Sequence, residues 1–293
     1  MLFRSVKNCY KCESENVVSK VAAIQMASGP NVKANLAEAE KLIKIAVQQE
    51  AELVVLPENF AIMGMAETDK VKIAEDIGSG LLQDYLKEQA RKHNIWLVGG
   101  TIPVRSSESG KVCAACLLFN PQGELVTRYD KIHLFDVTIE ASDESYTESE
   151  TITPGDKVIV VDTPFGRLGL AVCYDLRFPE LFRAMVDLDM EICALPSAFT
   201  SLTGKVHWES LLRSRAIENL SYMIAADQGG YHVGGRETYG DSMIVDPWGQ
   251  VLNRLPHGTG VVVADIDIAK LEHNRKMFPA LNHKRFKCSL SVN

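Results

Sequence analysis

LGLAVCYDLRFP, residues 168–179, is the stretch of sequence that decides the fold. Small and apolar residues run up to Cys173, and the pattern predicts a strand over 167–172 followed by a helix over 179–189. A cysteine at the sharp exit of a buried strand projects into the crevice at the strand's carboxyl end, where α/β sheets usually place ligands. The segment therefore predicts an α/β fold with Cys173 at a nucleophile elbow. A buried structural cysteine is the alternative that this segment alone leaves open.

Strand-like and helix-like segments alternate along the rest of the chain. Asn35 should cap a helix, with Glu38 in the capping-box position. Residues 80–94 and 206–220 also have a helical pattern, and residues 136–155 should form an acidic loop. We expect strands over 20–26, 52–56, 95–104, 158–162, 191–195, 222–227, 242–245 and 261–266, and a hairpin of 112–119 with 124–134. This interleaving predicts α/β layers with both parallel and antiparallel pairing.

The size and charge of the chain exclude several classes of partner. It has 293 residues, 46% hydrophobic residues and a formal net charge of −7. We expect a flexible N-terminal extension over 1–19 and one domain over 20–293. A diffuse acidic balance argues against nucleic-acid or anionic-membrane partners, which need a basic patch. The sequence contains no run of 18 apolar residues, so we expect no transmembrane helix.

The cysteines indicate a reducing compartment. There are seven of them, an odd number with scattered spacing, and the N-terminus has no apolar region typical of a secretory signal. We therefore expect reduced thiols and a cytoplasmic protein; a short mitochondrial presequence is the weaker alternative. Two C-x2-C pairs, Cys9 with Cys12 and Cys113 with Cys116, suggest a zinc site. The second pair falls in a predicted strand, where positions three apart face opposite sides, so we expect no metal.

Two ionisable residues follow predicted strands. Glu58 comes directly after Pro57 at the end of one strand, where a carboxylate could take a proton from a thiol and return it to a leaving amine; a solvated loop acid is the simpler alternative. If residues 128–135 are extended, Lys131 and His133 share one face. A lysine facing inward is costly unless an anion meets it, and a developing oxyanion would be such a partner. A thiol protease would instead pair Cys173 with His133 or His207.

Several long segments, in the expected order, resemble the nitrilase superfamily of carbon–nitrogen hydrolases from about Val21 to the C-terminus. They are LPEN at 56–59, RYDKIHLFD at 128–136, GLAVCYDLRFPE at 169–180, PSAFTSLTGKVHWESLLRSRAIEN at 196–219 and DSMIVDPWG at 241–249. The resemblance implies a four-layer α-β-β-α sandwich and a homodimer. It places the family's catalytic triad on Glu58, Lys131 and Cys173, with Glu148 as a second glutamate.

The resemblance also implies the mechanism, which needs no cofactor. Glu58 would activate Cys173, whose thiolate attacks the amide carbon, while Lys131 and the backbone N–H of Tyr174 hold the oxyanion. Glu58 would then protonate the departing ammonia and activate the water that hydrolyses the thioester. Glu148 would meet Lys131 or place that water.

The segments after the nucleophile narrow the branch. Tyr174-Asp175 resembles the amidase side, where nitrile-cleaving members have Trp-Glu, and 196–219 resembles the Nit branch. This implies hydrolysis of a small amide that carries a carboxylate, with deaminated glutathione first, α-ketoglutaramate as the ω-amidase alternative, and a non-catalytic interaction protein as the third reading. Asp241, where a histidine is common, and the Cys113–Cys116 strand depart from the branch.

Four residues are candidates for substrate binding. Arg236 lies in a Gly-flanked loop and is the first candidate for binding the carboxylate, because an arginine fork meets a carboxylate at two places. Arg177 is the second candidate, although its widely shared segment favours a structural ion pair. Phe199 and Thr200, in PSAFTSLTG, complete the set.

Self-association should use the helix after the nucleophile and the C-terminal segment. That helix, 178–189, has more apolar residues than one core-facing stripe needs, namely Leu181, Phe182, Met185 and Val186. Trp208 and Trp248 are expected to pack, the latter as a buried indole in the turn Asp246-Pro247-Trp248-Gly249.

Overall fold

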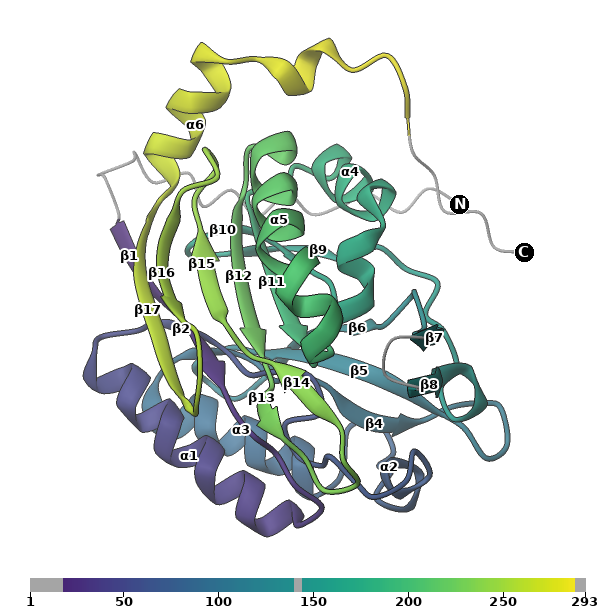
Figure 1. The fold of residues 1–293 in the computed structure, drawn as a ribbon. Coiled ribbons are helices and arrows are strands. Elements are labelled where there is room, and N and C mark those ends of the chain that lie inside the picture. Colours follow the sequence, from purple (N-terminus) through teal and green to yellow (C-terminus); the bar gives the residue numbers. More distant parts are fainter. Residues whose placement is uncertain (1–17, 140–143, 288–293) are drawn as a thin grey trace, which may run out of the picture.

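Two β-sheets lie face to face in the computed structural model, which describes residues 18–139 and 144–287 (Figure 1). The first, seven-stranded sheet has the order β17 (Gly260–Asp267), β1 (Val18–Gln25), β2 (Leu53–Val55), β3 (Trp96–Val98), β5 (Val112–Phe119) and β4 (Ile102–Arg105), with β6 (Leu125–Asp130) also paired to β5. The second, six-stranded sheet has the order β16 (Val251–Leu255), β15 (Ser242–Val245), β12 (Tyr222–Asp227), β11 (Ile192–Ser197), β10 (Gly166–Leu170) and β9 (Val160–Thr163).

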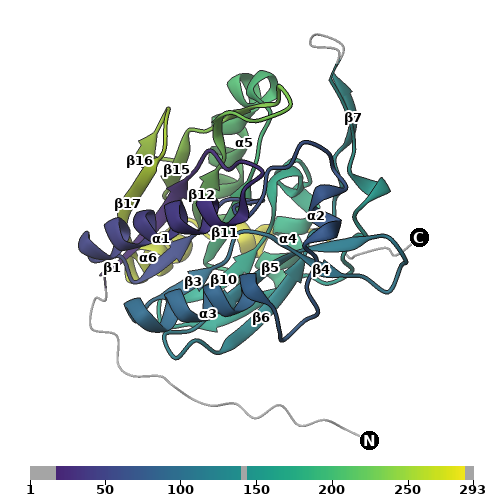
Figure 2. The ribbon, with the colours of Figure 1, turned by 90° about the horizontal axis from the view of Figure 1, so that it is seen from below.

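Helices cover both outer faces. α1 (Val32–Gln48) and α3 (Leu81–His93) pack on the first sheet, side by side in Figure 2, and α4 (Pro179–Asp187) and α5 (Ser201–Asn219) pack on the second. This is the predicted four-layer α-β-β-α sandwich. The remaining elements are α2 (Asp69–Lys72), α6 (Ile268–Met277), the hairpins β7 (Asp136–Ile139) with β8 (Glu144–Thr147) and β13 (Gly229–Tyr231) with β14 (Glu237–Tyr239), and the 3-10 turns η1 (Glu148–Glu150), η2 (Cys173–Arg177) and η3 (Ala280–His283).

Four strands of the first sheet, β1, β2, β3 and β5, are buried on both faces along most of their length, which explains their nearly continuous apolar sequence. In β1, Val21 and Ala23 belong to the core between the sheets, whereas Ala22 and Ile24 belong to the core under α1 and α3. β2 and β5 alternate in the same way. The period of two along each strand therefore builds two cores at once.

Some local predictions are wrong for identifiable reasons. The expected strand over 95–104 is two strands, because Gly100 adopts a left-handed φ of +57° and a Cβ there would lie 2.1 Å from the Pro57 carbonyl oxygen. α5 begins at Ser201, five residues earlier than expected, and includes Gly204. A Cβ at Gly204 would lie 2.4 Å from the Tyr239 side chain, so this glycine allows close packing inside the helix. The acidic loop contains β7 and β8, and α6 was not predicted.

Two expectations about apolar side chains also fail. The four apolar residues of α4 are all buried in the chain's own core. They therefore leave no exposed apolar surface on this helix for the expected self-association. Trp248 is 62% exposed, whereas Trp208 is fully buried as predicted.

β1 begins at Val18, so the predicted extension loses its last two residues; residues 1–17, with Cys9 and Cys12, lie outside the described ranges. The division into an extension and one domain stays a prediction. Within 18–139 and 144–287, no helix has the length and apolarity to cross a membrane, and no group of three His, Cys, Asp or Glu side chains could hold a metal ion.

The N-terminus of α1 is capped by Asn31, not Asn35: the Asn31 side chain accepts the Ala34 N–H at 3.1 Å. Asn35 is buried inside the helix. Its amide donates to the carbonyls of Gly29 and Ala61, both at 2.8 Å, and accepts the Gly29 N–H at 2.9 Å. Asn35 thus joins α1 to two loop segments.

Asn35→Ala should therefore destabilise the protein by about 3 kcal/mol, because it leaves buried backbone groups unpaired. Asn31→Ala removes one exposed cap and should cost about 1 kcal/mol. Urea unfolding of both variants measures the difference, and a larger loss for Asn31→Ala would contradict the assignment.

Candidate active site

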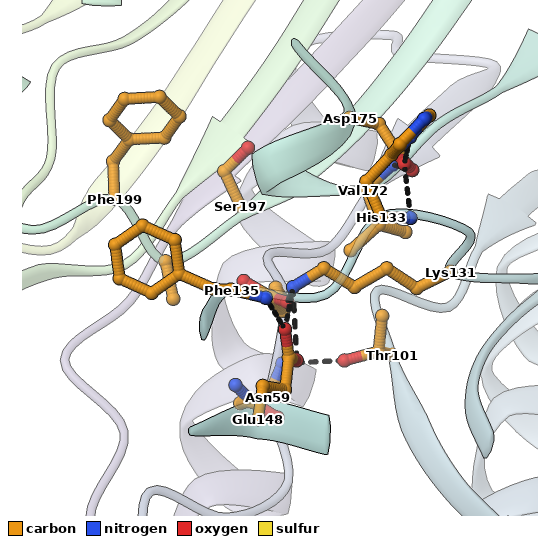
Figure 3. A network of polar contacts seen from close by, with 12 residues as sticks. Asn59, Thr101, Lys131, His133, Phe135, Glu148, Val172, Asp175, Ser197 and Phe199 are labelled. Atoms are coloured by element: carbon orange, nitrogen blue, oxygen red, sulfur yellow. Dashed lines mark hydrogen bonds and ion pairs between the residues drawn. The ribbon is translucent and has the colours of Figure 1, made fainter. Parts of the chain in front are cut away.

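A lysine and two glutamates from separate strand ends meet in one buried cluster. Lys131 follows β6, Glu58 lies three residues after β2, and Glu148 begins η1 after β8. The Lys131 Nζ donates to Glu58 Oε1 at 2.8 Å and to Glu148 Oε2 at 2.8 Å and Oε1 at 3.0 Å. Figure 3 shows the lysine reaching the Glu148 carboxylate. Cys173, directly after the loop that ends β10, lines the same pocket.

The backbone around Glu58 is held from three sides. The Asn59 N–H donates to Thr101 Oγ1 at 2.9 Å, a contact visible in Figure 3. The Gln228 amide donates to the Glu58 carbonyl at 3.0 Å. Gly100 approaches Pro57 too closely for any side chain. These contacts fix the direction in which the carboxylate leaves the strand.

Asp175 ties the cysteine turn to the lysine segment. Its fully buried carboxylate accepts the Val172 N–H at 2.8 Å, just before the nucleophile. The same carboxylate accepts the Tyr129 hydroxyl at 2.6 Å and the His133 N–H at 3.0 Å, on either side of Lys131. It also contacts the His133 ring at 2.7 Å (Figure 3). One side chain therefore sets the distance between the two segments.

The electrostatics of the cluster keep the lysine charged. Burial alone would lower the pKa of Lys131, but Glu148 and Glu58 outweigh it and hold that pKa well above its usual value. Burial would raise the pKa of Glu148, yet the charges of Lys131 and Lys70 hold it below the usual value. The Phe135 N–H, which donates to Glu148 Oε2 at 2.7 Å, contributes to this lowering.

The cysteine rests as a thiol. Burial, and after it the charge of Glu58, raise the pKa of Cys173 well above that of a free cysteine, against the opposing charge of Lys131. Cys173 also has a φ of +46°, a left-handed conformation uncommon outside glycine and typical of a sharp turn. A thiol in this state needs a base to become a nucleophile.

All nine residues proposed from the sequence line the pocket: Glu58, Lys131, Glu148, Cys173, Tyr174, Arg177, Phe199, Thr200 and Arg236. Tyr174 lies in the first turn of η2, where backbone N–H groups lack acceptors within the turn. The pocket wall also includes residues that sequence reasoning missed: Asn59, Glu67, Lys70, Phe135, Tyr146, Thr147, Ala198 and Thr203. Several of these residues lie inside the motifs quoted above, so the motifs could have indicated them as pocket residues. Lys70 lies in α2, a helix that was not predicted.

The two arginines have different surroundings. Arg177 contacts His207 Nδ1 at 3.1 Å, and its guanidinium lies 5.0 Å from the ring centre of Phe199 and 5.8 Å from that of Tyr174. These partners carry no negative charge, and Arg177 forms no ion pair with another described residue, so the structural ion pair expected for it is wrong. Arg236 donates to the Ala198 carbonyl at 3.0 Å and lies over the ring of Tyr146.

The histidines do not serve Cys173. His133 is bound to Asp175 and stacks on Phe178 with ring centres 3.7 Å apart. His207 contacts Arg177. Neither lines the pocket, which disfavours the thiol-protease alternative.

Asp227, at the end of β12, is a further buried acid that sequence reasoning missed. One carboxylate oxygen accepts the Phe199 N–H at 2.9 Å, and the other is buried with no hydrogen-bond partner among the described residues. Burial raises the pKa of Asp227 well above its usual value, which favours the neutral form. Asp227 thereby fixes the backbone of Phe199 in the wall of the pocket.

Lys131→Met should abolish turnover, because it removes the only cation between Glu58 and Glu148 among the described residues and the proposed oxyanion donor. A lost donor alone is worth roughly 3–4 kcal/mol, or about two to three orders of magnitude in kcat. The two glutamates would then repel each other, so circular dichroism must confirm folding. Lys33→Met, at an exposed position of α1 outside the pocket, is the matched control. A folded Lys131→Met protein with full activity would remove Lys131 from the mechanism.

Comparison with known proteins places this geometry in a family. Residues 20–276 match the family model described as carbon-nitrogen hydrolase. The chain is 43% identical over 273 residues to a deaminated glutathione amidase of Yersinia enterocolitica, covering 93% of this chain and 95% of the relative. It is 39% identical to the deaminated glutathione amidase of Homo sapiens, covering 90% and 82%. The crystal structure of Saccharomyces cerevisiae Nit3, of branch 10 of the nitrilase superfamily, superposes with a TM-score of 0.82 at 32% identity, covering 92% and 97%. The chain belongs to the carbon–nitrogen hydrolase family.

Proposed function

We propose that this hydrolase of carbon–nitrogen bonds is a cysteine-dependent amidase that cleaves deaminated glutathione, with Glu58, Lys131 and Cys173 as its catalytic residues. The observation that carries the proposal is the Lys131 ammonium, bound to Glu58 and Glu148 in the pocket that also holds Cys173. The names of the relatives from Yersinia enterocolitica and Homo sapiens support the substrate.

Acylation begins with proton transfer. Glu58 takes the proton from the Cys173 Sγ as the sulfur attacks the amide carbon, and the carbonyl electron pair moves onto oxygen. The Lys131 ammonium and the Tyr174 N–H hold that oxyanion. As the tetrahedral species collapses, the carbon–nitrogen bond breaks and Glu58 gives its proton to the leaving nitrogen.

Deacylation repeats the steps with water. Glu58 takes a proton from water, the hydroxide attacks the thioester carbon, and the carbon–sulfur bond breaks with return of the proton to sulfur. The products are the free acid and the resting thiol. The amine released first is ammonia from a primary amide and cysteinylglycine from deaminated glutathione.

Arg177 is the better candidate of the two arginines for the carboxylate of the acyl half. It is partly buried beside Phe199, and the partners described above leave its charge uncompensated. Burial lowers the pKa of Arg177, the signature of a desolvated cation that an anion would stabilise. The hydroxyls of Thr200 and Thr203, 2.7 Å apart, lie in the same wall.

Turnover of deaminated glutathione tests the proposal. The wild type should release α-ketoglutarate and cysteinylglycine, and Cys173→Ala should lose about four orders of magnitude of kcat or more, because the nucleophile is gone. Cys193→Ala is the matched control, since Cys193 is buried in β11 away from the pocket. Retained activity in a folded Cys173→Ala protein would show that another group attacks the amide. A wild type inactive on every amide tested would support the non-catalytic alternative.

The cytoplasmic location of the protein stays a prediction, and a mitochondrial location stays its alternative.

A homodimer is also proposed, through a surface that keeps the expected C-terminal segment but uses the end of α5 in place of α4. Trp248 contacts Phe278 with ring centres 5.8 Å apart, Met277 precedes Phe278, and Ile217 of α5 lies beside Gly249. These four apolar side chains are 48–67% exposed. Contiguous exposed apolar residues at the ends of α5 and α6 fit a second copy of the chain.

Trp248→Glu should convert this dimer to a monomer, because the carboxylate would be buried without a partner in the interface. Sedimentation at micromolar concentration gives the mass, and Trp248→Phe should remain dimeric. A wild type that sediments as a monomer would refute the dimer, and a dimeric Trp248→Glu would refute this surface.

A further inference from the structure

A second, larger chamber adjoins the catalytic pocket. Its volume is about 470 Å³, against about 30 Å³ for the inner pocket that holds Cys173. Its walls are residues 62–67, the end of β8 and the turn between β13 and β14, which lie near α2 in Figure 1. Six residues line both spaces: Asn59, Glu67, Lys70, Tyr146, Thr147 and Arg236. We propose that this outer chamber binds the amine half of the amide, an amine of dipeptide size that carries a carboxylate.

The direction of the substrate follows from the proposed function, on which this inference rests. Cys173 and Arg177 line only the inner pocket, so the acyl carbon and the acyl carboxylate lie there. The leaving nitrogen must face Glu58, which gives it a proton. Asn59, the next residue, belongs to the shared wall. Any substituent on that nitrogen therefore points through the shared wall into the outer chamber.

The outer chamber has the chemistry for an anionic, partly apolar amine. Its ionised lining side chains are Glu67, Lys70 and Arg236, one negative and two positive charges, or +1, in a chain of net −7. Lys70 is paired with Glu67 at 2.5 Å, whereas Arg236 is bound to a carbonyl and an aromatic ring. Arg236 thus supplies the unbalanced positive charge at the junction.

The size of the chamber separates two substrates with the same acyl half. α-Ketoglutaramate and deaminated glutathione both carry an α-ketoglutaryl group, but the first releases ammonia and the second releases cysteinylglycine. A space of about 470 Å³ is far larger than ammonia needs and lies within the range of small-molecule sites. Its apolar wall residues, among them Met65 and Val233, suit the uncharged part of a dipeptide.

Two substitutions that enlarge side chains on two segments lining the chamber test the proposal. Val233→Trp and Met65→Trp should each lower the ratio of kcat/KM for deaminated glutathione over α-ketoglutaramate by about tenfold or more, because displaced contacts act only on the longer substrate. Val18→Trp, at an exposed position of β1 that lines neither space, should leave the ratio unchanged. An unchanged ratio in both chamber variants overturns the proposal.

A binding measurement separates this inference from the proposed function. Calorimetry with the Cys173→Ala variant should give tighter binding of deaminated glutathione than of α-ketoglutaramate, and adding Val233→Trp should remove most of that difference. Equal affinities would overturn the outer chamber even if turnover is normal. Different affinities in a protein that hydrolyses neither compound would overturn the proposed function and keep the chamber.

Discussion

The buried ammonium of Lys131 is the interaction on which the rest of the site depends. A charge with 2% of its surface exposed is tolerated only with good partners, and Glu58 and Glu148 supply them. The cluster then carries one cation and two anions, so its net charge is negative in a buried space. Glu58, the proposed base, lies in this space together with Cys173, whose thiol has a raised pKa. The same charges therefore serve both folding and the proposed chemistry.

This arrangement requires the segments that carry Cys173 and Lys131 to keep fixed positions relative to each other. Asp175 does so by binding Val172 on the cysteine side and Tyr129 and His133 on the lysine side. Because a fully buried carboxylate that loses partners is costly, any shift between the segments is resisted. Asp227 holds Phe199 in the opposite wall in a similar manner. Asp175 and Asp227, two buried acids outside the lysine–glutamate cluster, thus fix the segments that form the pocket around it.

The sequence was most informative where a pattern is local or a motif is long. Periodicity located most of the central strands, and the motifs placed Glu58, Lys131, Glu148 and Cys173 in one pocket. It was less informative where the outcome depends on distant contacts. Asn35 has the chemistry of a cap, but two loops bind it inside the helix. The outer chamber could not be predicted, because three short segments far apart in the chain form its walls.

The burial of β1 on both faces also limits which mutations this strand can accept in evolution. Val21 and Ala23 face one core and Ala22 and Ile24 the other, while β1 pairs with β17 along eight residues and with β2 along three. Deleting one residue would turn each side chain beyond the deletion toward the other core. Ile24 would then occupy a space that fits an alanine, and an alanine would occupy the space that fits isoleucine. Point substitutions of similar volume are tolerable here, but insertions and deletions are not. Length variation among related chains is therefore expected in the loops, and this strand should keep a constant length.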